Sequence, residues 1–128
     1  MKRMTLFLLS LLVLAGCTAP AQRTPGYRQI TMDEAVVMMA EESDYIILDV
    51  RTREEFSDKH IPGAICIPNE TIGIEDIPEL PNKDQLILVY CRSGNRSKQA
   101  SEKLVALGYT NIVEFGGIND WPGETVSE

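Results

Sequence analysis

A cysteine followed by two arginines and a glycine is the strongest candidate for chemistry in this chain. The thiol is Cys91, and the residues after it are Arg92, Ser93, Gly94, Asn95, Arg96 and Ser97. Gly94 permits backbone angles that turn successive N–H groups inward, and the arginines add positive charge. These features favour the thiolate, which is the nucleophilic form of a cysteine. The segment is therefore predicted to hold a reactive thiolate, with Ser93 and Asn95 shaping the loop.

A buried strand and a helix are predicted to position this cysteine. The apolar run 86–90 directly precedes Cys91, and residues 95–107 carry apolar side chains at helical spacing. In open parallel sheets, functional groups gather beyond the carboxyl ends of the strands. The unpaired N–H groups and the positive dipole end of the following helix would further stabilise an anion there.

The rest of the pattern alternates strands and helices. Runs rich in β-branched residues at 45–48, 64–67 and 112–115 predict three further strands. Capping boxes that begin at Thr31 and Thr52 predict two helices. This alternation indicates an α/β fold with a parallel sheet between two helical layers.

Two other segments complete this prediction. Residues 71–84 contain Pro78 and Pro81 and are expected to form mostly loop, with one helical turn at most. Gly108 is placed to end the 95–107 helix in a left-handed conformation, which lets Tyr109 pack back on that helix.

The amino-terminal segment is predicted to lie outside the folded domain. Residues 1–16 have a positively charged start and an apolar run too short to span a membrane, which is typical of a secretory signal. Residues 14–17, Leu-Ala-Gly-Cys, resemble a bacterial lipobox, in which the signal is cut before a cysteine that becomes acylated. Cys17 is then a lipid anchor, 17–26 a flexible linker and 27–128 the domain. The alternative is an ordinary cleaved signal with a chance cysteine.

Composition and charge exclude several classes of protein. The chain has 128 residues, enough for one domain, and 12 basic against 19 acidic residues give a net charge of −7. A nucleic-acid-binding domain of this size is normally basic, so we expect no nucleic-acid partner. Three cysteines are too few for a disulfide scaffold. A single histidine leaves no cluster of metal ligands, so we expect neither metal nor cofactor.

Four segments in the right order resemble the rhodanese-like sulfurtransferase family. They are Leu48-Asp49-Val50-Arg51, His60-Ile61-Pro62-Gly63-Ala64, the loop 91–97 and Gly116-Gly117-Ile118-Asn119-Asp120-Trp121. Each segment alone is weak evidence for this resemblance, but four segments in this order are specific to the family. The resemblance covers the chain from about residue 27 to residue 121. The resemblance implies a five-stranded, mainly parallel sheet with helices on both faces.

The resemblance also implies a reaction. In this family the loop cysteine takes a sulfane sulfur from a donor, becomes a persulfide and passes the sulfur to a thiophilic acceptor. Here Cys91 would attack a small-molecule donor such as thiosulfate, and backbone N–H groups of residues 92–97 would hold the persulfide anion. Arg92 or Arg96 would attract an anionic donor, and a thiol or cyanide would remove the sulfur. The protein is expected to be a sulfurtransferase of the thiosulfate type.

The predicted lipid anchor places this reaction at the cell envelope. The domain would face the extracytoplasmic side of a membrane, which is the periplasm in a cell with two membranes. An oxidising exterior exposes a bare thiolate to oxidation, so a reducing partner protein could accompany it.

Other residues have both a structural and a functional interpretation. Asp49 and Arg51 are expected to support the loop as an ion pair rather than by contact with substrate. His60 could act as a base, but its place before a Pro-Gly turn favours a structural role. Cys66 lies among isoleucines and is expected to pack in the core, with a resolving thiol as the alternative. The loop arginines could instead form surface salt bridges.

Two other functions stay open at this point. The domain could be a persulfide carrier or binding module that does not turn over. It could also be a cysteine-based phosphatase or arsenate reductase, whose loops likewise hold a thiolate. The phosphatase pattern has an arginine where this chain has Ser97, whereas here the arginine comes one position earlier. The shorter loop favours one sulfur atom over a tetrahedral oxyanion.

Overall fold

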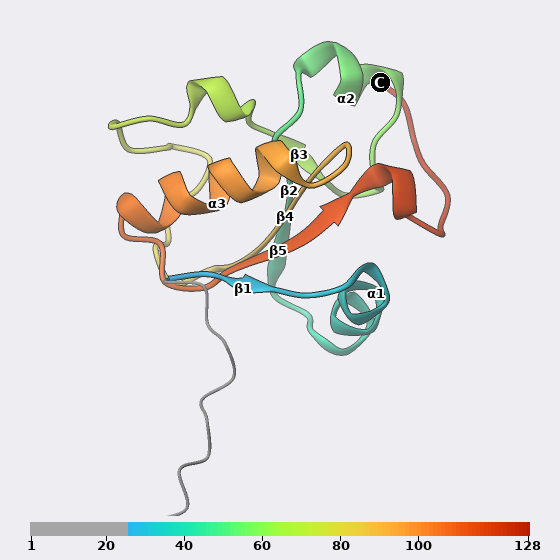
Figure 1. Cartoon of the computed structure of the whole chain (residues 1–128), viewed down its shortest axis with the longest axis horizontal. Coiled ribbons are helices and arrows are strands. Elements are labelled where there is room, and N and C mark those ends of the chain that lie inside the picture. Colours follow the sequence, from blue (N-terminus) through green and yellow to red (C-terminus); the bar gives the residue numbers. More distant parts are fainter. Residues whose placement is uncertain (1–25) are drawn as a thin grey trace, which may run out of the picture.

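The computed structural model describes residues 26–128 (Figure 1). The predicted signal, the lipidated Cys17 and all but the last residue of the predicted linker lie outside the described residues. Within 26–128, no helix combines the length and the apolar character needed to cross a membrane.

A five-stranded sheet forms the centre of the described domain. Its strands are β1 (Arg28–Gln29), β2 (Tyr45–Asp49), β3 (Ile65–Cys66), β4 (Leu86–Cys91) and β5 (Ile112–Gly117). Their spatial order is β1-β5-β4-β2-β3, and every pair of neighbouring strands is parallel. The central strand β4 is covered on both faces, which explains its almost uninterrupted apolar sequence. The predicted fold is confirmed.

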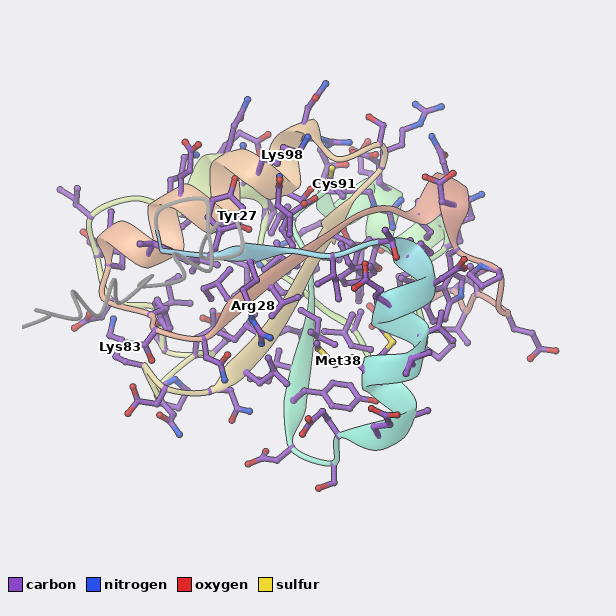
Figure 2. All side chains as sticks on the ribbon, turned by 60° about the horizontal axis from the view of Figure 1, so that its bottom comes forward. Tyr27, Arg28, Met38, Lys83, Cys91 and Lys98 are labelled. Atoms are coloured by element: carbon purple, nitrogen blue, oxygen red, sulfur yellow. The ribbon has the colours of Figure 1, made fainter. Side chains whose placement is uncertain are left out.

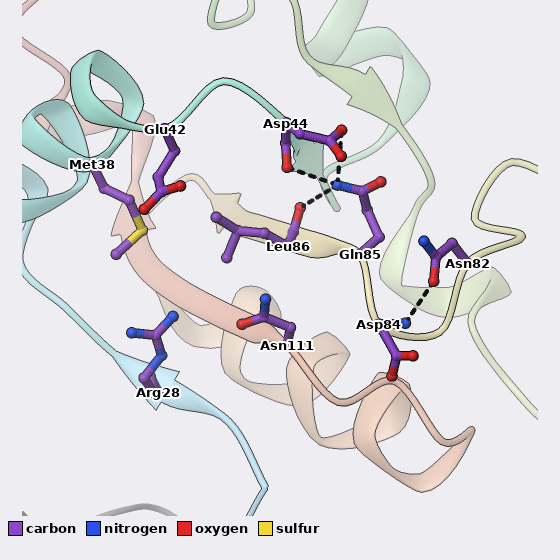
Figure 3. A pocket seen from close by; sticks show the side chains of 9 residues that line it. All are labelled: Arg28, Met38, Glu42, Asp44, Asn82, Asp84, Gln85, Leu86 and Asn111. Atoms are coloured by element: carbon purple, nitrogen blue, oxygen red, sulfur yellow. Dashed lines mark hydrogen bonds between the residues drawn. The ribbon is translucent and has the colours of Figure 1, made fainter.

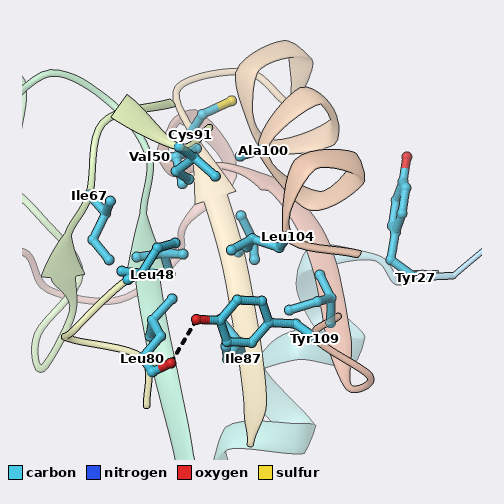
Figure 4. Packing of buried hydrophobic residues seen from close by; sticks show 14 residues of the cluster. Tyr27, Leu48, Val50, Ile67, Leu80, Ile87, Cys91, Ala100, Leu104 and Tyr109 are labelled. Carbon is cyan, nitrogen blue, oxygen red and sulfur yellow. Dashed lines mark hydrogen bonds between the residues drawn. The ribbon is translucent and has the colours of Figure 1, made fainter. Parts of the chain in front are cut away.

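Three α-helices cover the two faces of the sheet (Figure 1). They are α1 (Met32–Glu41), α2 (Arg53–Asp58) and α3 (Asn95–Ala106), and two short 3₁₀ helices, η1 (Asn69–Thr71) and η2 (Ile118–Asp120), follow β3 and β5. Buried residues of α3 pack into one apolar cluster and buried residues of α1 and α2 into another. Figure 4 shows the cluster on the α3 face.

Side chains of β4 contribute alternately to these two clusters. Val89 and Cys91 belong to the cluster under α3, whereas Leu88 and Tyr90 belong to the cluster under α1 and α2. This alternation follows from the pleat of a strand, which points successive side chains to opposite faces. Tyr90 and Cys91, although adjacent in the chain, therefore serve different sides of the molecule.

The predicted helix ends are confirmed. Both capping boxes form: the Thr31 hydroxyl accepts from the Glu34 amide, and the Thr52 hydroxyl accepts from the Glu55 amide, each at 3.2 Å. Gly108 adopts φ +97°, and the Tyr109 amide donates to the Leu104 carbonyl at 3.1 Å. Each motif satisfies backbone groups that a helix end would otherwise leave unpaired.

The sequence prediction differed from the structure at the edges of the sheet. Strand β1 was missed because two residues are too few to show a period. Strand β3 is shorter than the predicted 64–67. Ala64 closes a turn onto Ile61, and beyond Cys66 the amides of Ile67 and Asn69 still donate to the Asp49 and Val50 carbonyls, each at 3.0 Å, before η1 begins. The helical turn expected inside 71–84 instead begins at Asn69.

Candidate active site

Cys91 is the last residue of β4, at the carboxyl edge of the sheet. Its side chain is 1% exposed, and Figure 4 shows the sulfur pointing toward the first turn of α3. The Gly94 amide donates to Sγ at 3.0 Å, and the thiol lies 3.4 Å from the Ser97 hydroxyl, to which it can donate. Cys91 thus lies in a small polar cup rather than in purely apolar packing.

Backbone geometry at the glycines shapes this cup. Gly94 has φ +111°, a left-handed conformation, and this turn aims its amide at the sulfur. Gly117 has no room for a side chain, because a Cβ there would clash with the carbonyl of Arg92. The Asn119 amide donates to that same carbonyl at 3.2 Å. The turn after β5 therefore fixes the position of the cysteine loop.

The sequence predicts that backbone amides of residues 92–97 surround the sulfur. In the structure, the Gly94 amide is the one that donates a hydrogen bond to it. Ser93 of the loop and Asn95, the first residue of α3, are exposed, whereas Ser97 is fully buried beside the sulfur. The hydroxyl of Ser97 lies 2.9 Å from the Gly94 carbonyl, so it also joins the two ends of the turn.

A buried acid that sequence analysis missed adjoins the cup. Glu114 of β5 is 3% exposed, and its Oε1 lies 2.6 Å from the Ser97 hydroxyl. The same oxygen accepts from the Gly116 amide at 2.9 Å. The available signal was a charged residue inside the apolar run 112–115, since a strand buried on both faces rarely carries an unpaired acid.

The two loop arginines have different surroundings. Arg96 forms a two-pronged ion pair with Glu55 of α2, at 2.7 Å and 3.0 Å. The hydrogen bond from Arg96 lowers the pKa of Glu55 to about 2. Arg92 is exposed and lines a cavity of about 340 Å³, whose other charged lining residues are the basic Arg51 and Lys59 and the acidic Glu55 and Asp58. Two arginines were predicted to attract the donor. Arg92 is the one that is exposed and forms no ion pair within the described residues.

Asp49 and Arg51 form a buried ion pair on the opposite face of the sheet. The Arg51 Nη2 atom lies 2.7 Å from Asp49 Oδ2, and the same oxygen accepts from the Tyr90 hydroxyl at 2.7 Å. Arg51 also donates to the Lys59 carbonyl at 2.7 Å. Burial and the neighbouring Asp49 raise the pKa of Tyr90, so its hydroxyl stays a donor. The group ties the end of β2 to β4 and to the segment after α2.

His60 and Cys66 lie on that same face. The His60 ring stacks on Phe56 with centroids 3.7 Å apart, and its Nδ1 lies 2.7 Å from the Phe56 carbonyl. Cys66 is half-buried against the α1 and α2 cluster, and burial raises the pKa of its thiol. The sheet separates Cys66 from Cys91, which packs under α3, so the pair does not have the arrangement of a resolving thiol and its partner.

The amino ends of the strands, at the opposite end of the sheet from Cys91, carry none of these groups. A cavity of about 330 Å³ lies there beside the first residue of β4, Leu86, and the residue before β5, Asn111 (Figure 3). Its lining mixes Arg28, Glu42 and several polar side chains. Figure 2 shows Cys91 and Lys98 toward the other end of the domain. Within residues 26–128, no three potential metal ligands cluster.

Family models match two parts of the chain. A model described as a rhodanese-like domain matches residues 31–124. A second model, described as a prokaryotic membrane lipoprotein lipid attachment site, matches residues 1–18. The first match spans the cysteine loop and the strands β2 to β5 that surround it.

Individual proteins agree with the first match. The chain is 37% identical over 73 residues to the thiosulfate sulfurtransferase PspE of Escherichia coli, covering 57% of this chain and 70% of that protein. It is 30% identical over 104 residues to the thiosulfate sulfurtransferase GlpE of Pseudomonas entomophila, covering 77% and 92%. Longer fungal relatives, named adenylyltransferase and sulfurtransferase, are matched over only 21% to 25% of their length.

Solved structures show the same architecture. The crystal structure of a rhodanese-like domain protein from Staphylococcus aureus superposes with a TM-score of 0.66 at 33% identity, over 79% of this chain and 98% of that one. The fold, the sequence matches and the ordered motifs therefore agree. The chain belongs to the rhodanese-like domain family.

Proposed function

We propose that this protein is a sulfurtransferase that carries sulfane sulfur on Cys91 as a persulfide. The observation that carries the proposal is the position of the Cys91 sulfur, at the carboxyl edge of the sheet with the Gly94 amide 3.0 Å away. An amide aimed at sulfur stabilises negative charge that develops there. Family membership supports the same reaction, because the relatives PspE and GlpE are named thiosulfate sulfurtransferases.

The proposed reaction has two halves. In the first, the Cys91 sulfur attacks the outer sulfur of a donor such as thiosulfate, a new S–S bond forms, and sulfite leaves with the electrons of the broken bond. In the second, a thiol or cyanide attacks the outer sulfur of the persulfide and regenerates Cys91. Neither half requires a metal or an organic cofactor.

The charges around the loop favour an anionic donor that enters beside Arg92. Arg92 is exposed, whereas the charge of Arg96 is compensated by Glu55 at 2.7 Å. An exposed guanidinium attracts a doubly charged donor over several ångströms and can hydrogen-bond its oxygens. We therefore assign the first encounter with donor to Arg92, and a mainly architectural role to Arg96.

The lipid-attachment match supports a position at the cell envelope. We propose that residues 1–16 are removed, that Cys17 is acylated, and that 17–26 link this anchor to the domain that begins at residue 27. The domain then faces the extracytoplasmic side, which is the periplasm in a cell with two membranes. An oxidising surrounding would make a reducing partner protein useful for keeping Cys91 active.

A donor assay with intact mass measurement tests the reaction. The wild-type protein should convert thiosulfate and cyanide to sulfite and thiocyanate, and should gain the mass of one sulfur atom when donor is supplied alone. Cys91→Ser should do neither, because no thiol remains to accept sulfur. Loading without steady-state turnover would indicate a carrier instead of an enzyme, and substantial turnover by Cys91→Ser would refute the assignment. A parallel phosphatase assay should stay at background.

Membrane fractionation tests the anchor separately. Cys17→Ala should move the protein from the membrane fraction to the soluble fraction, because no acylated residue would remain. Persistent membrane association of this variant would contradict the lipid anchor without affecting the reaction.

A further inference from the structure

Glu114 is a buried acid that the proposed reaction leaves without a role. It is 3% exposed, and within residues 26–128 no basic side chain forms an ion pair with it. The hydroxyl of Ser97 at 2.6 Å and the amide of Gly116 at 2.9 Å are the partners that the structure gives its Oε1. Burying a carboxylate without a cationic partner costs free energy, because hydrogen bonds from neutral donors compensate its charge only weakly.

A continuous path of hydrogen bonds connects Glu114 with the reactive sulfur. The Cys91 thiol can donate to Ser97 Oγ at 3.4 Å, and Ser97 can donate to Glu114 Oε1 at 2.6 Å. The second distance is that of a charge-assisted O–H···O⁻ bond. A hydroxyl has one proton, so Ser97 cannot donate to a carboxylate and to a thiolate at the same time.

The single proton of the Ser97 hydroxyl links the protonation state of Cys91 to that of Glu114. With Glu114 ionised and bonded to Ser97, the sulfur keeps its proton and donates it to Ser97 Oγ. With the Cys91 sulfur ionised, Ser97 can turn its proton toward sulfur, and a protonated Glu114 can then donate to Ser97 Oγ and keep that bond. The Gly94 carbonyl, 2.9 Å from Ser97 Oγ, is the competing acceptor for the Ser97 proton. Two negative charges in this small buried site would be bridged by one hydroxyl and would repel each other.

We propose that Glu114 and Cys91 share one proton through Ser97. Glu114 acts on the sulfur only through Ser97, and so it is a positioning residue. Its role in turnover rests on the proposed function. When Cys91 attacks thiosulfate, the S–H bond breaks, Ser97 takes that proton and passes its own to Glu114, the new S–S bond forms and sulfite leaves. The charge is unchanged, since one carboxylate is replaced by one persulfide anion.

Other charged and titratable groups near this path must be considered in any pH experiment. From the elements packed around Glu114 and Cys91, they are Arg96 and Glu102 of α3, Tyr27 before β1, Glu70 of η1, and Glu55 of α2 through its ion pair with Arg96. Burial, Glu102 and Glu114 raise the pKa of Tyr27, which keeps that phenol neutral. Gln29, the register partner of Glu114 on β1, carries no charge.

The rate of Cys91 alkylation as a function of pH tests the shared proton. Iodoacetamide would be applied to the full-length mature protein, and modification of Cys91 would be read by peptide mass spectrometry, so that Cys66 does not contribute. The wild-type profile should rise in two steps, as expected for a coupled pair. Glu114→Gln should give one step at lower pH, with a rate about tenfold higher on the acidic side of the wild-type transition, because the thiolate no longer forms beside a carboxylate.

Two further variants separate this path from a general charge effect. Glu102→Gln removes one exposed acid from α3 and should keep the wild-type profile. In a Ser97→Ala background the additional change Glu114→Gln should alter the rate much less than it does in the wild type, because the hydrogen-bonded connection is absent. Equal effects of Glu114→Gln in both backgrounds, or equal profiles for Glu114→Gln and Glu102→Gln, would overturn the proposal.

The alkylation profile and the thiosulfate assay can fail independently of each other. A single-step wild-type profile overturns the shared proton even if thiosulfate turnover is found, and it needs no variant that could fail to fold. A two-step profile in a protein without thiosulfate turnover supports the shared proton and removes thiosulfate turnover from the proposed function.

Discussion

Two buried carboxylates at the carboxyl edge of the sheet have opposite surroundings. Asp49, on the α2 face, accepts from the Arg51 guanidinium and from the Tyr90 hydroxyl, with its shortest contacts at 2.7 Å. Glu114, on the α3 face, accepts from Ser97 and a backbone amide, with no cation paired to it in the described residues. The first acid has a cationic partner and belongs to a structural network, whereas the second has neutral donors, the arrangement from which we propose its shared proton with Cys91.

The same strand serves both acids. Tyr90 contacts Asp49, and the next residue, Cys91, contacts the Ser97 that binds Glu114. Because successive side chains of a strand point to opposite faces, a buried ion-pair network and the proposed catalytic thiol can lie one residue apart without contact. The network on the α2 face holds the end of β4 in place, and the cysteine loop on the other face begins from that fixed point.

Breaking the Asp49 network should have the largest effect on stability. Asp49→Asn leaves the Arg51 charge buried without its partner and should lower the free energy of unfolding by about 3–5 kcal/mol. Glu114→Gln is the matched change on the other face and should cost about 1 kcal/mol or less, because the amide oxygen still accepts both hydrogen bonds. Urea unfolding of both variants measures this difference. Equal losses would contradict the distinction between the two acids.

Removing one hydroxyl from the network should have an intermediate effect. Tyr90→Phe leaves Asp49 with one donor fewer and the Ile61 amide without its acceptor, which lies 3.1 Å away. We expect a loss of about 1–3 kcal/mol in the free energy of unfolding. Sulfur transfer per folded molecule should stay near the wild-type value, since the phenol faces away from Cys91. A strong loss of turnover in a folded Tyr90→Phe protein would show that the two faces are coupled.

The two described thiols should differ in function as the two faces do. Cys66→Ser should leave sulfur transfer largely intact, because Cys66 lies on the α2 face and its thiol faces the Arg51 carbonyl at 3.6 Å. The matched change Cys91→Ser should abolish transfer. Steady-state turnover compares the two variants, with circular dichroism as the check on folding. A loss in Cys66→Ser as large as in Cys91→Ser would revive the resolving-thiol interpretation.

The ion pair between Arg96 and Glu55 should give the smallest effect, and one that depends on pH. Arg96 lowers the pKa of Glu55 from 4.5 to about 2, so this pair stabilises the fold fully above about pH 4.5 and loses its contribution as the pH falls toward 2. Glu55→Gln keeps a capping residue and removes the charge, and should cost about 0.2–1 kcal/mol at neutral pH. The difference in melting temperature between wild type and variant should shrink toward pH 2. A constant difference would contradict the ionic origin.

Sequence patterns predicted the parts of the site that are local in the chain. The cysteine, its glycine and the start of α3 lie within seven consecutive residues, so their order alone indicated a strand, a turn and a helix. The Thr31 and Thr52 capping boxes were likewise predicted, since each joins residues three apart. By contrast, Ser97 and Glu114 are 17 residues apart, and Arg96 and Glu55 are 41 apart. No periodic pattern relates residues at such separations, and neither contact was predicted.

The chain sequence by itself determined the α/β fold, the helix ends and the cysteine loop, because each depends on backbone propensities and hydrophobic periods of a few neighbouring residues. Only the tertiary structure decided which acid lies beside the sulfur, which arginine is compensated and which face holds Cys66. Those features depend on strand register and on the crossovers that bring distant strands to one edge. A shift of one residue in any strand would turn its side chains to the other face, so the site exists only through the assembled sheet.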